Sequence, residues 1–204
     1  VIKSVVPIDV QDAGFDYLCV AGHKGLYGPM GTGLLISKSG RMPKSIIEGG
    51  TGTSSDSLIQ PDAMPEQLES GTPNLPGVAG LRAGIEFVSK KGVPAIFSHE
   101  MKLVQRLYDG LSRQKDIKLY TERPEALHFV PVLSFNVEGL SSEEVGQRLN
   151  RMGVAVRPGL HCAPAAHSFM GTLKQGAVRV CPSAFSNINE IDRFILDMMK
   201  IRAK

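Results

Sequence analysis

The chain has 204 residues, of which 42% are hydrophobic and 21% charged, and its formal net charge is +3. These values are typical of a folded globular protein, and so small and scattered a charge argues against a nucleic-acid-binding surface. No run of about 18 apolar residues occurs, which argues against a membrane-spanning helix. The three cysteines, Cys19, Cys162 and Cys181, lie in dissimilar contexts, so we expect a reducing, cytoplasmic setting rather than a disulfide framework.

The first third of the chain places a lysine in a glycine-rich loop between two strand-like runs. Residues 16–21 predict a buried strand, and residues 33–37 predict a second one. Glycine lets backbone approach the lysine side chain closely, and a lysine needs such surroundings to become a useful nucleophile. Lys24 is therefore either a candidate for Schiff-base chemistry with pyridoxal phosphate or a solvated loop lysine. The loop reads Ala21-Gly22-His23-Lys24-Gly25-Leu26-Tyr27-Gly28-Pro29-Met30-Gly31-Thr32-Gly33.

The middle of the chain predicts a long connection followed by helices. Residues 48–76 are rich in Gly, Ser, Thr and Pro and have little periodicity, and ordered connections of that length are usually functional or form interfaces. Apolar residues at helical spacing predict helices over 78–88 and 94–113.

The remaining residues predict a small α+β domain in which a sheet carries packed helices. A helix is expected over 142–152, with Ser141 or Ser142 as its N-cap, and a final helix is expected to begin near Asn187 or Asn189. The predicted strands cover residues 117–120, 130–137, 154–157 and 177–181. The fold class is thus α/β, with a first domain over 1–85 and a second over 86–204.

A second group of reactive side chains surrounds Cys162, in Arg157-Pro158-Gly159-Leu160-His161-Cys162-Ala163-Pro164-Ala165-Ala166-His167. The flanking cation and imidazoles favour a thiolate, so Cys162 is a candidate nucleophile. A packed loop cysteine is the alternative. A zinc site is disfavoured, because His161 and Cys162 are adjacent and no second cysteine pair exists. We therefore expect no metal.

Arg179 lies within an apolar strand, where an unpaired charge is costly. Its partner is either a substrate carboxylate, held through two hydrogen bonds, or a structural Asp or Glu. Cys19 and Cys181 lie in similar apolar runs, and we expect both in the core.

Four motifs, in this order, resemble cysteine desulfurase-like enzymes of the class V aminotransferase family, specifically their C-terminal portion. The resemblance covers essentially the whole chain. The motifs are Gly22-His23-Lys24 with Gly28-Pro29-Met30-Gly31-Thr32-Gly33, Glu69-Ser70-Gly71-Thr72-Pro73-Asn74, Arg157-Pro158-Gly159-Leu160-His161-Cys162-Ala163, and Arg179-Val180-Cys181-Pro182-Ser183-Ala184-Phe185-Ser186-Asn187.

The resemblance implies a role for five residues. Lys24 would bind pyridoxal 5'-phosphate covalently and move substrate protons, and His23 would contact the cofactor. Thr72 would reach the phosphate of a partner subunit, which implies a homodimer. Cys162 would take sulfur from L-cysteine as a persulfide, leaving L-alanine, and Arg179 would hold the substrate carboxylate.

The resemblance also implies a fold and a biological setting. Residues 1–85 would be the end of the large, fold-type I cofactor domain, and residues 86–204 the small C-terminal α+β domain. A sulfur-acceptor protein and iron–sulfur cluster assembly are the expected context.

The chain departs from the family pattern in two respects. Ala21 stands where the family often has Ser or Thr, and the family's other cofactor-binding residues lie upstream of Lys24. We therefore expect a fragment that is inactive by itself. Selenocysteine lyase, another class V aminotransferase and a non-catalytic dimerisation module remain alternatives.

Overall fold

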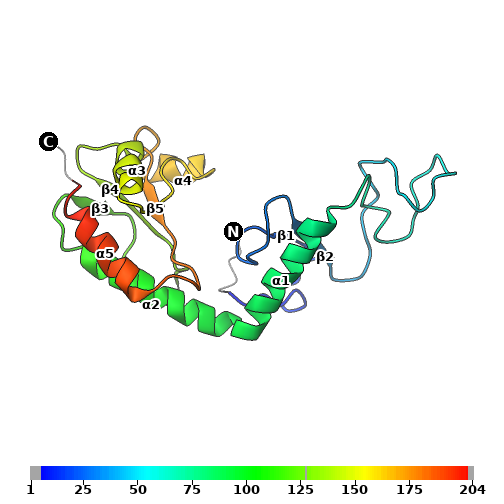
Figure 1. Cartoon of the computed structure of the whole chain (residues 1–204), viewed down its shortest axis with the longest axis horizontal. Coiled ribbons are helices and arrows are strands. Elements are labelled where there is room, and N and C mark those ends of the chain that lie inside the picture. Colours follow the sequence, from blue (N-terminus) through cyan, green and yellow to red (C-terminus); the bar gives the residue numbers. More distant parts are fainter. Residues whose placement is uncertain (1–5, 127, 202–204) are drawn as a thin grey trace. The chain divides into compact units, whose positions relative to one another are not determined.

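The computed structural model describes residues 6–126 and 128–201, and the chain divides into two compact units between Val93 and Pro94 (Figure 1). The predicted boundary after residue 85 falls inside helix α1 (Leu75–Lys91). The helix continues past that point, and its buried residues there include Gly84, which lies against the backbone of Leu26, and Val88. It ends at Gly92, whose φ of 85° favours glycine.

The N-terminal unit contains an antiparallel ribbon of β1 (Tyr17–Ala21) and β2 (Gly33–Ser37). Tyr17 pairs with Ser37 and Ala21 with Gly33, so the lysine loop joins the two strands. The expectation that this first strand is buried, with Cys19 in the core, is wrong: Tyr17 is 44% exposed and Cys19 is exposed. A ribbon of two strands has too few neighbours to cover both of its faces.

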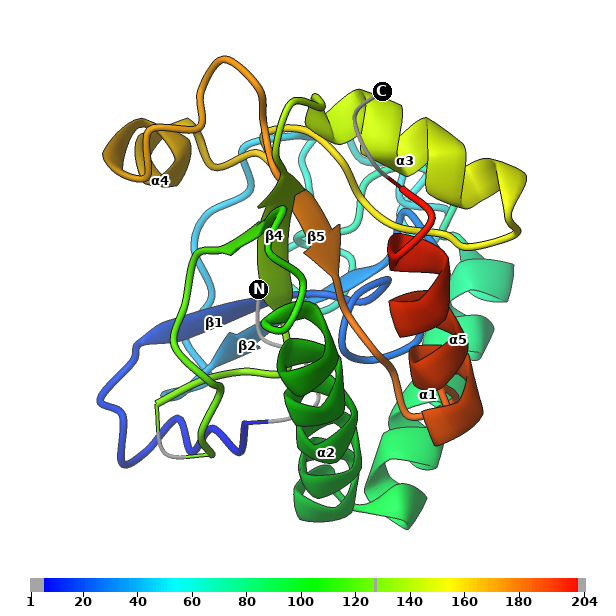
Figure 2. The same cartoon turned by 90° about the vertical axis from the view of Figure 1, so that its left-hand side faces the viewer.

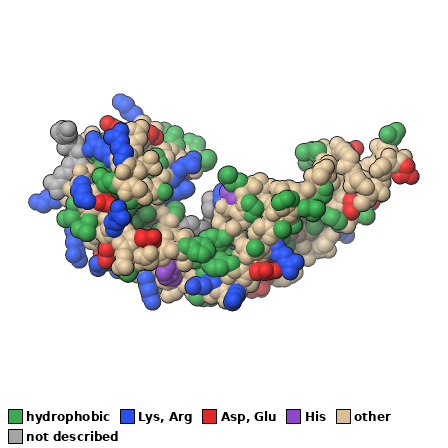
Figure 3. Space-filling view, in the orientation of Figure 1, with side chains coloured by type: hydrophobic (Ala, Val, Ile, Leu, Met, Phe, Trp, Pro, Cys, Tyr) green, Lys and Arg blue, Asp and Glu red, His purple; other side chains and the backbone are tan. Residues whose placement is uncertain are grey.

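Helix α1 begins earlier than predicted because its start signals precede the apolar repeat. The Asn74 side chain accepts a hydrogen bond from the Gly77 amide at 3.0 Å, and a proline occupies the first turn. Residues 38–74, between β2 and α1, contain neither helix nor strand. Hydrophobic side chains are exposed along this segment, and Figure 3 shows hydrophobic side chains in green. The exposed residues include Ile46, Ile47, Leu58 and Ile59.

The C-terminal unit is built on a three-stranded antiparallel sheet of order β3-β4-β5, and Figure 2 shows β4 and β5 side by side. Its strands are β3 (Ile117–Leu119), β4 (Leu133–Val137) and β5 (Val178–Val180). Its helices are α2 (Val93–Leu111), α3 (Ser142–Arg151), α4 (Pro164–Phe169) and α5 (Ile188–Met198). Among the described residues, no helix combines the length and apolar character needed to cross a membrane.

The core of this unit lies on one face of the sheet. Side chains alternate along a strand, so Leu133, Phe135 and Val137 of β4 all point to that face and are buried. The Phe135 ring meets the edge of Phe194 from α5, with centroids 6.4 Å apart. The helices add their apolar stripes, including Leu107, Leu111, Val145, Leu149 and Met198.

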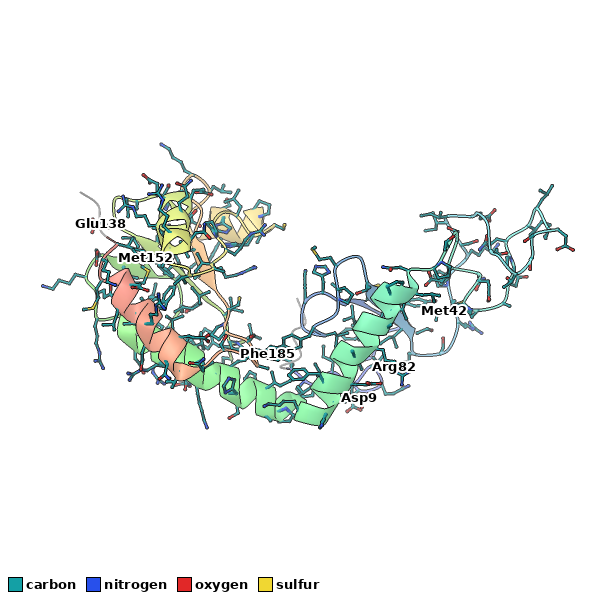
Figure 4. All side chains as sticks on the ribbon, in the orientation of Figure 1. Asp9, Met42, Arg82, Glu138, Met152 and Phe185 are labelled. Atoms are coloured by element: carbon teal, nitrogen blue, oxygen red, sulfur yellow. The ribbon has the colours of Figure 1, made fainter. Side chains whose placement is uncertain are left out.

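Both helix starts predicted in this unit are confirmed. Ser141 caps α3 and Asn187 caps α5, and each forms a capping box with a glutamate three residues later. Helix α3 ends at Arg151 and is followed by its C-cap residue Met152, which is labelled in Figure 4.

Two predicted strands differ from the structure. The strand expected over 130–137 begins only at Leu133, because Pro131 has no amide hydrogen to contribute to the ladder. The strand expected over 154–157 is a single bridge between Arg157 and Arg179.

Candidate functional site

The loop that carries Lys24 is held in shape by its own backbone. The Gly22 amide donates to the carbonyl of Thr32, and the Gly28 amide donates to the carbonyl of Gly22, each at 2.9 Å. The Lys24 amide in turn donates to the Ala21 carbonyl at 3.3 Å. These bonds close the loop just above the end of the ribbon, so the position of the Lys24 backbone is defined.

Helix α1 packs directly on this loop. A Cβ on Gly22 would come within 2.9 Å of the Leu81 side chain, and one on Gly28 within 2.8 Å. A Cβ on Gly84 would overlap the carbonyl oxygen of Leu26. On the other side, the Tyr27 ring meets the edge of Phe87, with centroids 5.4 Å apart. Glycines on both sides of this contact thus let helix and loop approach closely enough to fix the lysine loop.

Replacing Gly84 with alanine is expected to loosen the loop and destabilise the N-terminal unit by about 1–3 kcal/mol, the usual cost of overpacking. The Leu26 carbonyl is backbone and cannot rotate away. Gly80→Ala is the matched control: its Cβ would meet only the Pro29 ring, at 3.1 Å, and alanine gains helix propensity. Amide hydrogen exchange at Gly22 and Gly28 measures the effect. Equal protection in the two variants would contradict the proposed packing.

His23 and Lys24 are adjacent in this loop, and both side chains are exposed. Thr72 is also exposed, on the segment just before the Asn74 cap of α1. An accessible primary amine on a restrained backbone, beside an accessible imidazole, fits the aldehyde and phosphate ends of pyridoxal phosphate in chemical type. The three residues could therefore hold part of that cofactor.

In the C-terminal unit, Cys162 is exposed on the loop that leads into α4. The base of this loop is anchored to the sheet, because Gly159 and Ala177 exchange two backbone hydrogen bonds of 3.1 Å. The Gly159 amide also contacts the Ser142 hydroxyl at 3.2 Å, which joins the loop to the start of α3. Gly176 packs closely against the same residue, because a Cβ at this position would come within 2.5 Å of the Ser142 hydroxyl.

The histidines beside Cys162 make specific contacts. His161 Nε2 lies 2.8 Å from the carbonyl oxygen of Arg157, and His161 Nδ1 lies 3.4 Å from His167 Nε2. His167 is buried, and its Nδ1 lies 2.7 Å from the Thr172 hydroxyl. The sequence predicted histidines near the thiol. In the structure, side-chain contacts connect His161 to His167 and His167 to Thr172.

Partial burial is the main reason that the pKa of His161 is lowered, and the nearby charges of Arg179, His167 and Arg157 lower it further. The hydrogen bond to the Arg157 carbonyl opposes this shift. The folded chain thus favours the neutral form of the His161 imidazole.

This shift predicts that acid weakens the fold through His161. The unfolded chain binds a proton near pH 6.5, whereas the folded chain binds it only at lower pH. The contribution of His161 to stability is therefore complete above that pH and declines as pH falls below it. Chemical unfolding measured at several pH values checks this against His161→Gln, which cannot titrate. If the free energy of unfolding changes with pH in the same way in the wild type and in His161→Gln, the lowered pKa assigned to His161 is refuted.

Arg179 lies in β5 directly opposite Ser134 of β4, on the sheet face away from the core. It is partly buried, and its Nε atom has no hydrogen-bond acceptor among the described residues. The structural Asp or Glu that sequence reasoning kept as an alternative is therefore not bonded to this atom. Asn136 lies two residues along β4 from Ser134 and is buried. Neither its Oδ1 nor its Nδ2 atom has a hydrogen-bond partner within the described part of the chain. Sequence reasoning missed Asn136.

The expectation that Cys181 is a core residue is wrong. Cys181 follows the last residue of β5 and is exposed, as is Phe185 in the same segment (Figure 4). The strand ends before it, and Pro182 follows, so the chain leaves the sheet there. No group of three or more His, Cys, Asp or Glu side chains that could hold a metal occurs within residues 6–126 and 128–201.

Helix α4 and Thr172 also went unpredicted. The expected loop around Cys162 does extend from Arg157, but the helix begins at Pro164. The signal was present: a proline suits the first helical turn, and Gly171 follows the helix end with a φ of 68°. Thr172 had no local signal, because its role depends on the position of His167.

The family model for class-V aminotransferases matches residues 4–194. Among curated relatives, a probable cysteine desulfurase of Xylella fastidiosa is 31% identical over 96% of the chain and 46% of its own length. A probable cysteine desulfurase of Pyrococcus abyssi is 36% identical over 92% of the chain and 47% of its own length. The chain thus spans about half the length of the relatives that it matches.

Solved structures agree in fold. The apo cysteine desulfurase of Thermococcus onnurineus is similar with a TM-score of 0.80 and 31% identity, covering 97% of this chain and 49% of that one. The Escherichia coli cysteine desulfurase CsdA is similar in fold, with a TM-score of 0.79 at 24% identity, over 97% of this chain and 48% of that one.

Proposed function

The chain belongs to the class V aminotransferase family of pyridoxal phosphate-dependent enzymes, and from that premise we propose that its protein is a cysteine desulfurase. The observation that carries this proposal is the exposed Cys162 thiol, which lies on an anchored loop. The adjacent residue is His161, whose lowered pKa favours the neutral imidazole. Amino-group transfer alone needs no such thiol. The relatives named cysteine desulfurases support the same choice.

The proposed reaction removes the sulfur of L-cysteine. The Cys162 thiolate attacks the substrate sulfur, an S–S bond forms, and the Cβ–S bond breaks with its electron pair going to Cβ. That carbon then takes up a proton, so L-cysteine and the Cys162 thiol become L-alanine and a Cys162 persulfide. The proton of the exposed Cys162 thiol passes to solvent, because both ring nitrogens of His161 already have other hydrogen-bond partners.

Three residues of the N-terminal unit would hold the cofactor. Lys24 would bind it covalently and His23 would contact it, since both side chains are exposed on the restrained loop. Thr72 would reach the phosphate of a partner subunit. Pyridoxal phosphate, when bound, supplies an electron sink for the substrate.

Arg179 would hold the substrate carboxylate. The Arg179 Nε atom is buried without a hydrogen-bond acceptor among the described residues, which costs free energy. An anion that binds the guanidinium lowers this free-energy cost. The lowered pKa of His161 also reflects the positive charge of Arg179, which places the two groups in one electrostatic environment.

We further propose a homodimer that passes sulfur to an acceptor protein in a reducing, cytoplasmic setting, as in iron–sulfur cluster assembly. Thr72 is followed closely by Leu75 and Val78, which are 69% and 57% exposed. Exposed apolar side chains next to a residue with a cross-subunit role are suited to an interface. Sedimentation of the protein with and without pyridoxal phosphate tests the dimer.

The test of function is turnover of L-cysteine by the full protein that carries this chain, with added pyridoxal phosphate. Equal amounts of alanine and sulfide are expected in the presence of a thiol reductant. Alanine and selenide from L-selenocysteine, with no sulfide from L-cysteine, would instead indicate selenocysteine lyase, which uses the same residues. A sulfur-containing keto acid, formed with an added keto acid as amino acceptor and without sulfide, would indicate another class V aminotransferase. If neither alanine nor a keto acid forms and the protein is still a dimer, the result would indicate a non-catalytic dimerisation module.

A further inference from the structure

The loop that presents Cys162 adopts an unusual backbone conformation. His161 and Cys162 have φ values of 56° and 58°, and the only other described non-glycine residue with a positive φ is Tyr27. Left-handed backbone is unfavourable for residues that carry a Cβ, and two in succession persist only if surrounding contacts impose them. The contacts that impose this conformation therefore bear on how the thiol is presented.

The His161 side chain bridges the two ends of this loop. Its Nε2 lies 2.8 Å from the carbonyl oxygen of Arg157, where the loop leaves the sheet. Its Nδ1 lies 3.4 Å from Nε2 of His167, which belongs to α4 where the loop ends. The two rings are tilted by 46°, with centroids 5.3 Å apart. His161 is thus restrained by both flanks of the turn that contains Cys162.

His167 is the fixed end of this arrangement. It is only 7% exposed, and its Nδ1 lies 2.7 Å from the hydroxyl of Thr172, which is 2% exposed. The Thr172 amide also donates to the His167 carbonyl at 2.8 Å. Both a side-chain and a backbone bond therefore hold Thr172 against His167, and burial keeps water from replacing them.

The acceptors determine where each proton lies. A carbonyl can only accept, so His161 Nε2 carries a proton, and in neutral His161 the Nδ1 atom is an acceptor. His167 Nε2 must then donate to it, which leaves His167 Nδ1 as an acceptor. The Thr172 hydroxyl can donate to that atom at 2.7 Å or to the His167 carbonyl at 3.4 Å, and the shorter contact completes the chain. Thr172, His167, His161 and the Arg157 carbonyl thus form one directional series of hydrogen bonds.

We propose that His167 and Thr172 are positioning residues that orient His161 and so impose the left-handed conformation that presents the Cys162 thiol. The inference rests on the proposed function only for the use made of that thiol. Both residues act through His161 and not through contact with the reacting sulfur. Their effect passes through the His161 ring to the backbone of Cys162, and a displacement of about 1 Å can lower a reaction rate roughly 100-fold.

The experiment is nuclear magnetic resonance on the full chain, which needs no cofactor. Imidazole ¹⁵N shifts report the tautomer of His161, and the intraresidue amide–Hα distance of Cys162 is shorter when φ is positive. Three variants are compared with the wild type: Thr172→Val removes only the hydroxyl, Thr172→Ser keeps it, and His167→Ala removes the ring. The His99 imidazole, whose Nε2 lies 2.8 Å from the Ser186 carbonyl, is the internal control for an intact unit.

We expect the wild type to show the Nε2–H tautomer of His161 and the short Cys162 distance. Thr172→Val and His167→Ala should shift His161 toward a tautomer mixture and lengthen that distance, with His99 unchanged, and Thr172→Ser should restore both signals. Unchanged His161 and Cys162 signals in Thr172→Val and His167→Ala would overturn the proposal.

Single-turnover kinetics connect this result to function. Formation of the Cys162 persulfide by the full protein should slow about tenfold or more in Thr172→Val, with the KM for cysteine unchanged and the rate recovered in Thr172→Ser. Absence of any persulfide in the wild type would overturn the proposed desulfurase function but leave the magnetic resonance result standing. The two failures are therefore distinguishable.

Discussion

Replacing Cys162 with serine is expected to abolish the release of alanine and sulfide from L-cysteine, by about 1,000-fold or more. A serine hydroxyl stays protonated near neutral pH and cannot accept sulfur as a persulfide. Cys19→Ser is the matched control, because Cys19 is also an exposed free thiol but lies in β1. Turnover is measured with cysteine and pyridoxal phosphate, and mass spectrometry detects the persulfide on Cys162.

The Cys162 variant also separates substrate binding from sulfur removal. Because Lys24, His23 and Arg179 remain in place, the change in cofactor absorbance on adding cysteine should persist while sulfide release is lost. Full sulfide release without the thiol would refute the role proposed for Cys162.

Replacing Lys24 with alanine is expected to remove both the covalently held cofactor and turnover, again by about 1,000-fold or more. The Lys24 amine is the group proposed to attach pyridoxal phosphate, and residues 21–33 contain no other lysine. Borohydride reduction followed by peptide mass spectrometry should find the cofactor on Lys24 in the wild type and no labelled peptide in the variant. Lys44→Ala, at another exposed lysine of the same unit, should behave as the wild type.

A second variant tests the loop that positions Lys24 rather than the amine itself. The Gly84→Ala variant keeps the amine but disturbs the loop that positions it, so the labelling yield should fall without vanishing. Reduced pyridoxal phosphate found on a lysine other than Lys24 in the wild type would contradict the assignment.

Local signals in the sequence predicted the elements well where the decisive contacts are local. Ser141 and Asn187 begin helices because each side chain satisfies an amide three residues away. Lys24 was identified as a candidate from the same kind of signal, since glycines and a strand flank it within a few residues, and its role stays a prediction. The family resemblance rested on such short motifs, and the family model matches over residues 4–194.

Burial was harder to predict, because it depends on what covers a residue. Cys19 and Cys181 lie in apolar runs, yet both are exposed. Cys19 belongs to a ribbon of only two strands, and Cys181 lies just past the end of β5. The hydrophobicity of a run shows that it can be buried, whereas the neighbours of the run decide whether it is.

The order of residues along the chain establishes which reactive groups this protein has: an amine in a glycine-rich loop, then a threonine, a thiol between imidazoles, and an arginine in a strand. How these groups are held depends on packing between elements that are distant in the chain. Helix α1 fixes the lysine loop because Gly84 allows backbone to approach backbone. The left-handed turn at Cys162 is imposed by His161, His167 and Thr172, whose contacts exist only once α4 has formed. Residue types are local properties of a chain, but distances between side chains are set by packing.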